Sequence, residues 1–131
     1  MVKLAGFDAR LYPTDDPLEP VPTGRYAVVI VDSEWKVTRS GIGQYLQLCL
    51  EVIEGDCAGR MMWLRLNLKN PNPSIVALAA TTFASVCRAV GLHVVDDSRE
   101  LHGIPFSVRV RRLVRPGNRE PFNKLDRFAA F

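Results

Sequence analysis

The chain has 131 residues, enough for one domain with a sizeable core, and 47% of them are hydrophobic. The net charge is only +3, and no apolar run approaches the ~20 residues that cross a membrane. The N-terminus lacks the apolar stretch of a signal peptide, and three widely spaced cysteines favour neither a disulfide framework nor a zinc site. We therefore expect a cytoplasmic domain with reduced thiols and no membrane segment.

The charge is unevenly distributed along the chain. Residues 1–34 carry three Lys or Arg against six Asp or Glu, whereas residues 105–131 carry seven against two. A basic C-terminal third is typical of a protein that binds a polyanion. The alternative is a solvated pair of basic strands without a ligand.

The first 23 residues differ in composition from the rest. They contain four prolines among acidic residues, and proline cannot donate the backbone hydrogen bond that a strand needs. Residues 1–23 are therefore predicted to form an extended, Pro-rich arm, and residues 24–131 the domain itself.

Alternating apolar and polar residues predict strands. The second and third strands alternate cleanly, with leucines on the inner face. The first strand is apolar on both faces, which predicts burial on both sides, and the residues after it, Glu34–Gly43, read as a loop. The predicted strands are 24–33, 44–53, 60–68, 105–114 and 122–128.

One helix is predicted between the third and fourth strands. Asn72 suits the N-cap, Pro73 the first turn, and Gly91 the position just past the C-terminal end. Apolar residues at helical spacing predict the side that packs on the strands. They are Ile75, Leu78, Ala79, Thr82, Phe83, Val86 and Val90.

The order of three strands, a helix and two strands predicts a mainly β fold. It is the element order of an OB-like five-stranded barrel with its helix between strands 3 and 4. Other small α+β domains share this order, so the barrel is an expectation from order alone.

The sequence shows no arrangement typical of catalysis. His93 and His102 lie in a polar region without a nucleophile motif, and Asp96 and Asp97 are neighbours that point to opposite sides of an extended segment. We therefore expect no enzyme activity, no catalytic residues, no metal site and no cofactor.

Binding residues gather on features that an OB-like domain uses for ligands. Such domains bind across the second and third strands and grip the ligand with two loops. Single-strand binders pair aromatic platforms for bases with cations for phosphates. Alternatively, Tyr45 and Trp63 pack under the arm or in a dimer interface. The predicted nucleic-acid-binding residues are Trp35, Lys36, Arg39, Tyr45, Gln47, Trp63, Arg65, Arg109, Arg111, Arg115 and Arg119.

Several short motifs resemble those of a phage-encoded family, the domain-of-unknown-function 669 family. The match extends over nearly the whole chain, and its most specific part is Asn67–Pro73. One departure is Lys124, where the family leads us to expect an acidic residue. The shared motifs are Phe7–Ala9, Pro22–Tyr26, Gly43–Leu46, Gly59–Arg60 with Trp63, Arg65–Leu68, Asn70–Pro73, Cys87–Gly91 and Glu100–Gly103.

The resemblance implies a phage protein that binds single-stranded DNA during replication or recombination in the host cytoplasm. RNA stays open as the ligand, because a contact to the 2′-hydroxyl has no sequence signature. A homo-oligomer or a recombination-protein partner is also compatible with the sequence. The alternative function is a protein-interaction or assembly module that assists a phage recombinase or nuclease.

Overall fold

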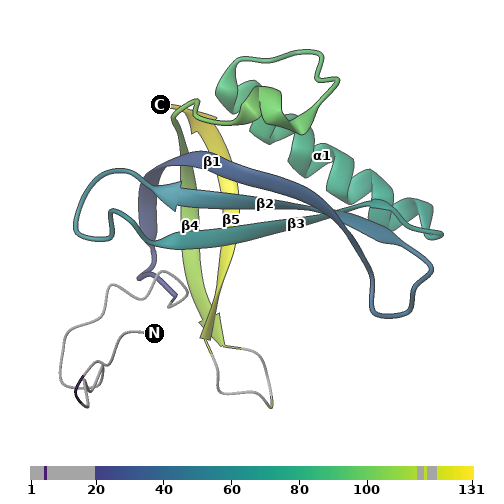
Figure 1. Ribbon diagram of the computed structural model, residues 1–131, viewed down its shortest axis with the longest axis horizontal. Coiled ribbons are helices and arrows are strands. Elements are labelled where there is room, and N and C mark those ends of the chain that lie inside the picture. The colour runs from purple at the N-terminus through teal and green to yellow at the C-terminus, as the bar shows by residue number, and fades with distance from the viewer. Residues whose placement is uncertain (1–4, 6–19, 115–116, 118–120) are drawn as a thin grey trace.

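A computed structural model describes residues 5, 20–114, 117 and 121–131. Five antiparallel strands form one sheet in the order β3-β2-β1-β4-β5, so the fold is mainly β with one long helix. In Figure 1, β4 and β5 cross steeply behind β1, β2 and β3, and α1 lies at one end of the strands. The elements are β1 (Gly24–Val37), β2 (Gln44–Val52), β3 (Met61–Lys69), α1 (Pro73–Val90), the short 3-10 helix η2 (Ser98–Leu101), β4 (Phe106–Val114) and β5 (Pro121–Ala130).

β1 is the central strand and pairs with a different neighbour at each end. Its first residues, Gly24–Val28, pair with β4, and the part from Val28 to Val37 pairs with β2. A bulge between Ile30 and Asp32 changes the register. A bulge bends a strand and increases its twist, so the sheet coils at this point.

The core lies on the inner face of this coiled sheet. Leu46, Leu48, Leu50 and Val52 of β2 are buried, as their alternation predicts. The inward side chains of β4 are also fully buried, while α1 and η2 cover the remaining side. The alternation predicted for the second and third strands is therefore confirmed, with Leu64 and Leu68 of β3 half-buried against the core.

The first strand departs from the prediction in two ways. It continues to Val37, beyond the expected end at Ser33, so the loop is shortened to the residues between Val37 and Gln44. Its second face is also not buried, since Val29 is half-buried and Val31 is 41% exposed. Among the described residues no element covers this outer face, so a continuous apolar run wrongly predicted burial on both sides.

α1 has the predicted bounds and caps. The Asn72 side chain accepts a hydrogen bond from the Ser74 backbone N–H, and Gly91 ends the helix with a positive φ of 84°. The helix packs on both β3 and β5. By length and composition alone, α1 is also apolar enough to cross a membrane, although no membrane segment was expected from the sequence. Core helices of soluble proteins pass the same test.

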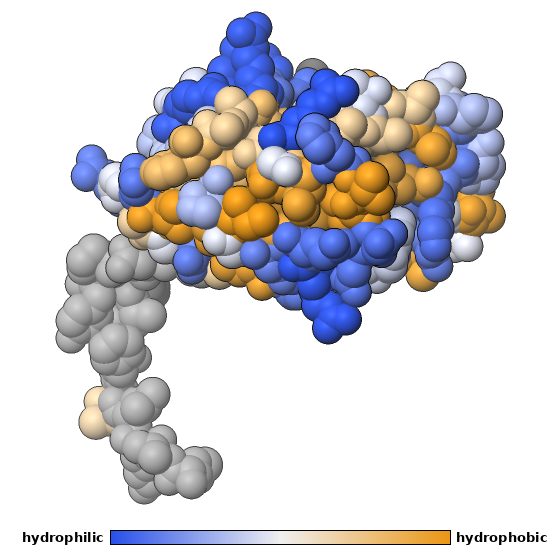
Figure 2. Space-filling model, turned by 90° about the horizontal axis from the view of Figure 1, so that it is seen from above, coloured by the Kyte–Doolittle hydropathy of each residue, from blue (hydrophilic) through white to orange (hydrophobic). Residues whose placement is uncertain are grey.

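The apolar stripe of α1 is only partly buried. Ala79, Val86 and Val90 are buried as predicted, whereas Ile75 is 38% and Leu78 is 72% exposed. Ile75 and Leu78 instead line an open groove between β3 and β5, so the prediction that they are packed on the strands is wrong. Figure 2, seen from the top of Figure 1, shows hydrophobic surface across the centre of this side of the molecule.

The two outer strands of the sheet, β3 and β5, are not paired with each other in the described part of the chain. The structure therefore shows an open five-stranded sheet, and a closed barrel is not formed by hydrogen bonds between these strands. α1 contacts both of them and bridges the opening on one side.

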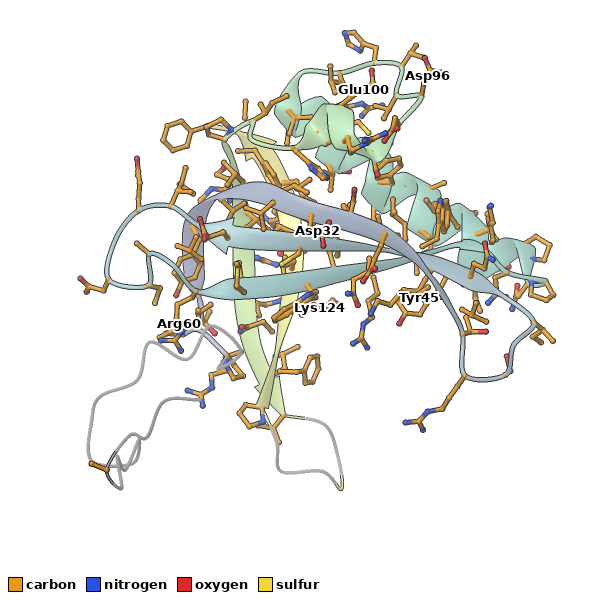
Figure 3. All side chains as sticks on the ribbon, in the orientation of Figure 1. Asp32, Tyr45, Arg60, Asp96, Glu100 and Lys124 are labelled. Atoms are coloured by element: carbon orange, nitrogen blue, oxygen red, sulfur yellow. The ribbon has the colours of Figure 1, made fainter. Side chains whose placement is uncertain are left out.

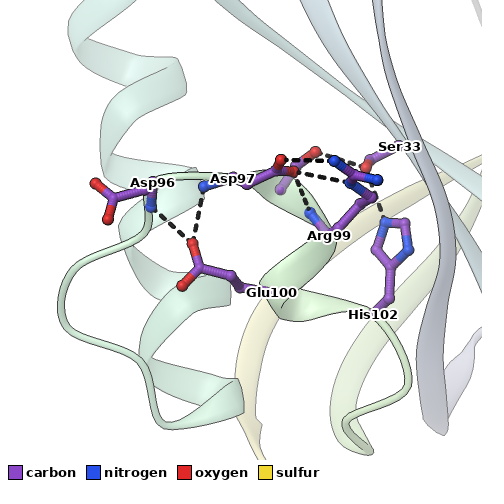
Figure 4. A network of polar contacts seen from close by, with 7 residues as sticks. Ser33, Asp96, Asp97, Arg99, Glu100 and His102 are labelled. Atoms are coloured by element: carbon purple, nitrogen blue, oxygen red, sulfur yellow. Dashed lines mark hydrogen bonds and ion pairs between the residues drawn. The ribbon is translucent and has the colours of Figure 1, made fainter.

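The segment between α1 and β4 is fastened to β1 near the bulge. His102 forms a β-bridge with Ile30, and its Nε2 lies 2.8 Å from the Ser33 Oγ. Asp97 caps η2 and accepts a hydrogen bond from the Arg99 backbone N–H, which holds the pKa of Asp97 below its usual range. These contacts form the polar network of Figure 4 and keep the segment against the sheet.

β4 and β5 are joined on their outer face by a shared carboxylate. Asp126 accepts a hydrogen bond from the Arg109 Nε at 2.7 Å and lies 3.0 Å from the Arg111 Nη2. The hydrogen bond from Arg109, together with both positive charges, holds the pKa of Asp126 below its usual range.

Replacing a large side chain by alanine should change the free energy of unfolding more in the C-terminal half of α1 than in the N-terminal half. Val86→Ala removes buried methyl groups and should cost about 2 kcal/mol of unfolding free energy. Leu78→Ala should cost less than about 0.5 kcal/mol, as at most exposed positions. Urea denaturation of both variants measures the difference, and a large loss for Leu78→Ala would show that this residue is covered in solution.

The Asp126 cluster should make stability depend on pH in the acid range. A lowered pKa contributes stability above the unfolded Asp value of about 3.9, and this is lost as the pH falls through the lower folded value. Asp126→Asn should therefore have a lower Tm than the wild type near neutral pH, and the difference should shrink below about pH 4. Asp56→Asn, in the exposed β2–β3 turn, is the control. A difference that persists unchanged in acid would contradict the assigned pairing.

Candidate nucleic-acid interface

Tyr45 lies between two cations on the outer face of the sheet. Lys36 is its direct partner across β1 and β2, and the guanidinium of Arg65 on β3 lies 5.8 Å from the centre of the Tyr45 ring. Lys36 also pairs with Glu34 at 3.2 Å. The row Lys36, Tyr45 and Arg65 thus combines an aromatic ring with positive charge from two neighbouring strands.

The glycine two residues before Tyr45 is required by close packing. A Cβ on Gly43 would lie 2.9 Å from the backbone oxygen of Lys69. The Gly43 backbone oxygen also accepts a hydrogen bond from the Thr38 N–H at 2.9 Å. The close approach of Gly43 to Lys69 packs the base of the β1–β2 loop against the end of β3. It thereby fixes the position of Tyr45 at the start of β2.

Trp63 shares the outer face with Tyr45 but is not its neighbour. Trp63 pairs with Cys49, four residues along β2 from Tyr45, and Arg65 pairs with Gln47 between them. At ~3.3 Å per residue, the two aromatic positions are about 13 Å apart along the strand. The two aromatic side chains therefore form two separate platforms with Arg65 between them.

A groove of about 760 Å³ lies where β3 and β5 fail to pair. It is bounded by the unpaired edge of β3 from Met61 to Asn67, the N-terminal part of α1 and the first half of β5. Its aromatic side chains are Trp63 and Phe122, and its charged side chains are Arg65 and Lys124. In Figure 3, Lys124 lies beside β3. No Asp or Glu lines the groove among the described residues.

The basic residues of β4, Arg109 and Arg111, lie next to this groove but do not line it. Lys124 is the cross-strand partner of Arg111, and Arg109 follows on the same face two residues away. Because Asp126 binds both arginines, its carboxylate neutralises part of their charge. Arg109 and Arg111 therefore form a partly compensated basic strip next to the groove, which weakens their case as direct phosphate ligands.

Trp35 is not part of this surface. It belongs to β1 and pairs with Leu46, so its side chain lies on the opposite face of the sheet from Tyr45. There Lys69 lies over its ring at 4.5 Å, beside a smaller pocket that Glu34, Asp96 and Asp97 also line. The structure therefore does not bring Trp35 together with Tyr45 and Trp63, and its role in binding stays a prediction.

The outer face of the sheet is itself divided in charge. Asp32 is the partner of Cys49 across β1 and β2, and Glu51 lies two residues further along β2, away from Tyr45. Burial, followed by the charges of Asp32 and Glu51, raises the pKa of the Cys49 thiol. Trp63, the partner of Cys49 across β2 and β3, lies at the border of this acidic end, whereas Lys36 and Arg65 lie toward Tyr45.

The structure brings together a subset of the predicted residues and adds others. Lys36, Tyr45, Gln47, Arg65 and Trp63 share one face, while Arg39 is exposed in the loop beside it. The two remaining predictions, Arg115 and Arg119, lie outside the described residues. Residues that the sequence analysis missed are Lys124, Phe122, Asn67 and Asn123, all of which line the groove.

The motifs that carry the family resemblance mostly build turns and caps. Asn70 accepts a hydrogen bond from the Asn72 N–H, and Asn72 in turn caps α1. Gly91 closes the same helix, and Glu100 accepts hydrogen bonds from the backbone N–H groups of Asp96 and Asp97. These motifs therefore identify the fold rather than a ligand. The described residues hold no group of three His, Cys, Asp or Glu side chains that could bind a metal ion.

No curated protein matches the sequence. The family described as "Protein of unknown function (DUF669)" matches residues 13–130. This agrees with the resemblance in the motifs and covers nearly all of the chain. The chain therefore belongs to the DUF669 family.

Proposed function

We propose that this protein binds single-stranded DNA without sequence preference, on a path that runs from Tyr45 past Arg65 into the groove at Lys124. The observation that carries the proposal is the groove itself, where Trp63, Arg65 and Lys124 come together without an acidic residue among the described groups that line it. Proteins that bind single strands combine aromatic rings for the bases with a cationic groove for the backbone.

The arrangement favours a single strand over a duplex. Bases can lie flat on Tyr45 and Trp63 only when they are unpaired and unstacked. Paired bases in a duplex cover one another's faces, so a duplex would meet only Lys36, Arg65 and Lys124. This selectivity follows from stacking and does not require hydrogen bonds to base edges.

We also propose that the sheet is a partly open barrel of the OB type, with the ligand near the opening. OB folds are often partly open and bind along strands 2 and 3 and their adjoining loops, and Tyr45, Gln47, Trp63 and Arg65 occupy those strands. The resemblance of the motifs to a phage family supports a role in phage DNA replication or recombination, in the host cytoplasm. The activity we propose is binding without catalysis.

A second candidate function is a protein-interaction module. The exposed Ile75 and Leu78 favour it, because α1 carries no charged residue before Arg88 and so presents an uncharged apolar surface. Such a surface suits a protein partner better than a phosphate chain. Binding through it would change little with salt concentration.

Binding to oligonucleotides tests the two functions directly. Fluorescence anisotropy should show that labelled oligo-dT binds more tightly than a duplex of equal length. If Lys36, Arg65, Lys124 and one further cation neutralise phosphates, the logarithm of the association constant should fall with the logarithm of salt with a slope of roughly −3. Oligo-rU distinguishes RNA from DNA. Equal binding of duplex and single strand, or no salt dependence, would rule out the proposed path.

Three aromatic substitutions test the position of the path. Each stacked base contributes ~1–3 kcal/mol, so Tyr45→Ala and Trp63→Ala should each weaken oligo-dT binding by about 5- to 150-fold. Trp35→Ala should leave the affinity within about twofold, because Trp35 lies on the opposite face from Tyr45, beside Asp96 and Asp97. Thermal melts establish that each variant is folded. If Trp35→Ala weakened binding as much as Tyr45→Ala, the ligand would follow a different face.

A further inference from the structure

The groove between β3 and β5 has strand edges as its walls. Every residue from Met61 to Asn67 on β3 and from Pro121 to Leu125 on β5 lines it, so side chains from both faces of each strand reach the groove. Among the described residues neither strand has a hydrogen-bonded neighbour on this side. The backbone groups of such an edge can pair with an added extended chain. The groove therefore offers a place for one more strand, with α1 beneath it.

The edge of β5 already binds a polypeptide backbone at one point. Pro20 lines the groove, and the adjacent Val21 is fully buried. The Val21 N–H donates to the Asn123 Oδ1, and the Asn123 Nδ2 donates to the Val21 carbonyl, both at 2.9 Å. The Asn123 amide thus satisfies the donor and the acceptor of one residue. A phosphate backbone carries acceptor oxygens and would match only half of such a pairing.

The floor of the groove is apolar and exposed. Ile75 is 38% and Leu78 is 72% exposed, and α1 carries no charged residue before Arg88. Met61 adds a further apolar side chain at the wall. Aliphatic side chains of a peptide would bury these groups, and a nucleotide strand has no aliphatic side chain to offer. The floor therefore favours a peptide.

Charge determines which peptide fits. Arg65 and Lys124 line the groove, and no Asp or Glu does so among the described residues. A second copy of the chain would bring the same cations to the edge, because its own free edges carry Arg65, Lys69 and Lys124. Like charges on neighbouring strands are destabilising, whereas opposite charges are stabilising. The preferred strand is therefore an acidic one from a different protein.

We propose that the groove binds an extended, acidic segment of a partner protein, which adds a strand between β3 and β5. Alternate side chains of the segment are apolar and pack on Ile75 and Leu78, and those between them are acidic and pair with Arg65 and Lys124. A DNA strand on the proposed path needs the same two cations, so the segment and the DNA exclude each other there. This competition rests on the proposed function, whereas the peptide contact does not.

The contact is tested on the full chain with a fluorescent peptide in which Val and Asp alternate over seven residues, the length of Met61–Asn67. One control peptide has Lys in place of Asp, and the other has N-methyl groups on alternate residues, which remove backbone donors and keep the charge. Anisotropy should show binding of the Asp peptide and about tenfold weaker binding of each control. Absent binding, or equal binding of either control, would overturn the proposal.

Protein variants separate this contact from the proposed function. Leu78→Ala and Lys124→Glu should each weaken the Asp peptide by about tenfold. Lys36→Glu is the matched control, since Lys36 lies outside the groove, and it should weaken oligo-dT but not the peptide. Leu78→Ala should leave oligo-dT binding within about twofold. Thermal melts establish that each variant is folded.

The outcomes for the two ligands are distinct. Equal loss of peptide binding in Lys36→Glu and Lys124→Glu would show a general charge effect and overturn the peptide site. Peptide binding by a protein that binds no oligo-dT would refute the proposed function and support the peptide site. The peptide should displace oligo-dT, and simultaneous binding of both would overturn the competition.

Discussion

The structure depends most on the way α1 packs against two strands that do not pair with each other. The helix contacts β3 and β5 and places Ala79 and Val86 in the core between them. Because the helix bridges these strands, the sheet can bury its inner face without closing. The groove, the exposed part of the helix and the unpaired strand edges all follow from this one packing arrangement.

Unpaired edges normally promote association with other chains, and this protein carries the usual protections against it. Charged side chains and prolines on an edge strand discourage further strand pairing. β3 carries Arg65 and Lys69, and β5 begins with Pro121 and carries Lys124. Two of these cations, Arg65 and Lys124, also line the groove. The same charges therefore discourage further strand pairing and make the lining of the groove positively charged.

The sequence predicted well those features that depend on neighbouring residues. The bounds of α1 follow from Asn72, Pro73 and Gly91, and the buried leucines of β2 follow from simple alternation. Trp35 was assigned to a loop because the first strand was expected to end at Ser33. β1 instead continues to Val37 through a bulge, after which each residue faces the opposite side from the one that simple alternation gives. Helical spacing placed Leu78 on the apolar stripe, but spacing cannot show that the two strands beside it do not pair and leave a groove open.

Lys124 shows why sequence patterns could not predict which residues line the groove. Its neighbours Asn123 and Leu125 give no sign of a groove, and Arg65 lies almost 60 residues earlier in the chain. Only the order of the strands, with β3 and β5 at opposite ends of one coiled sheet, brings the two cations to a common opening. Asp126, two residues after Lys124, instead binds Arg109 and Arg111. The most basic strand in the sequence is thus partly neutralised, while a lysine in a less basic segment faces the groove.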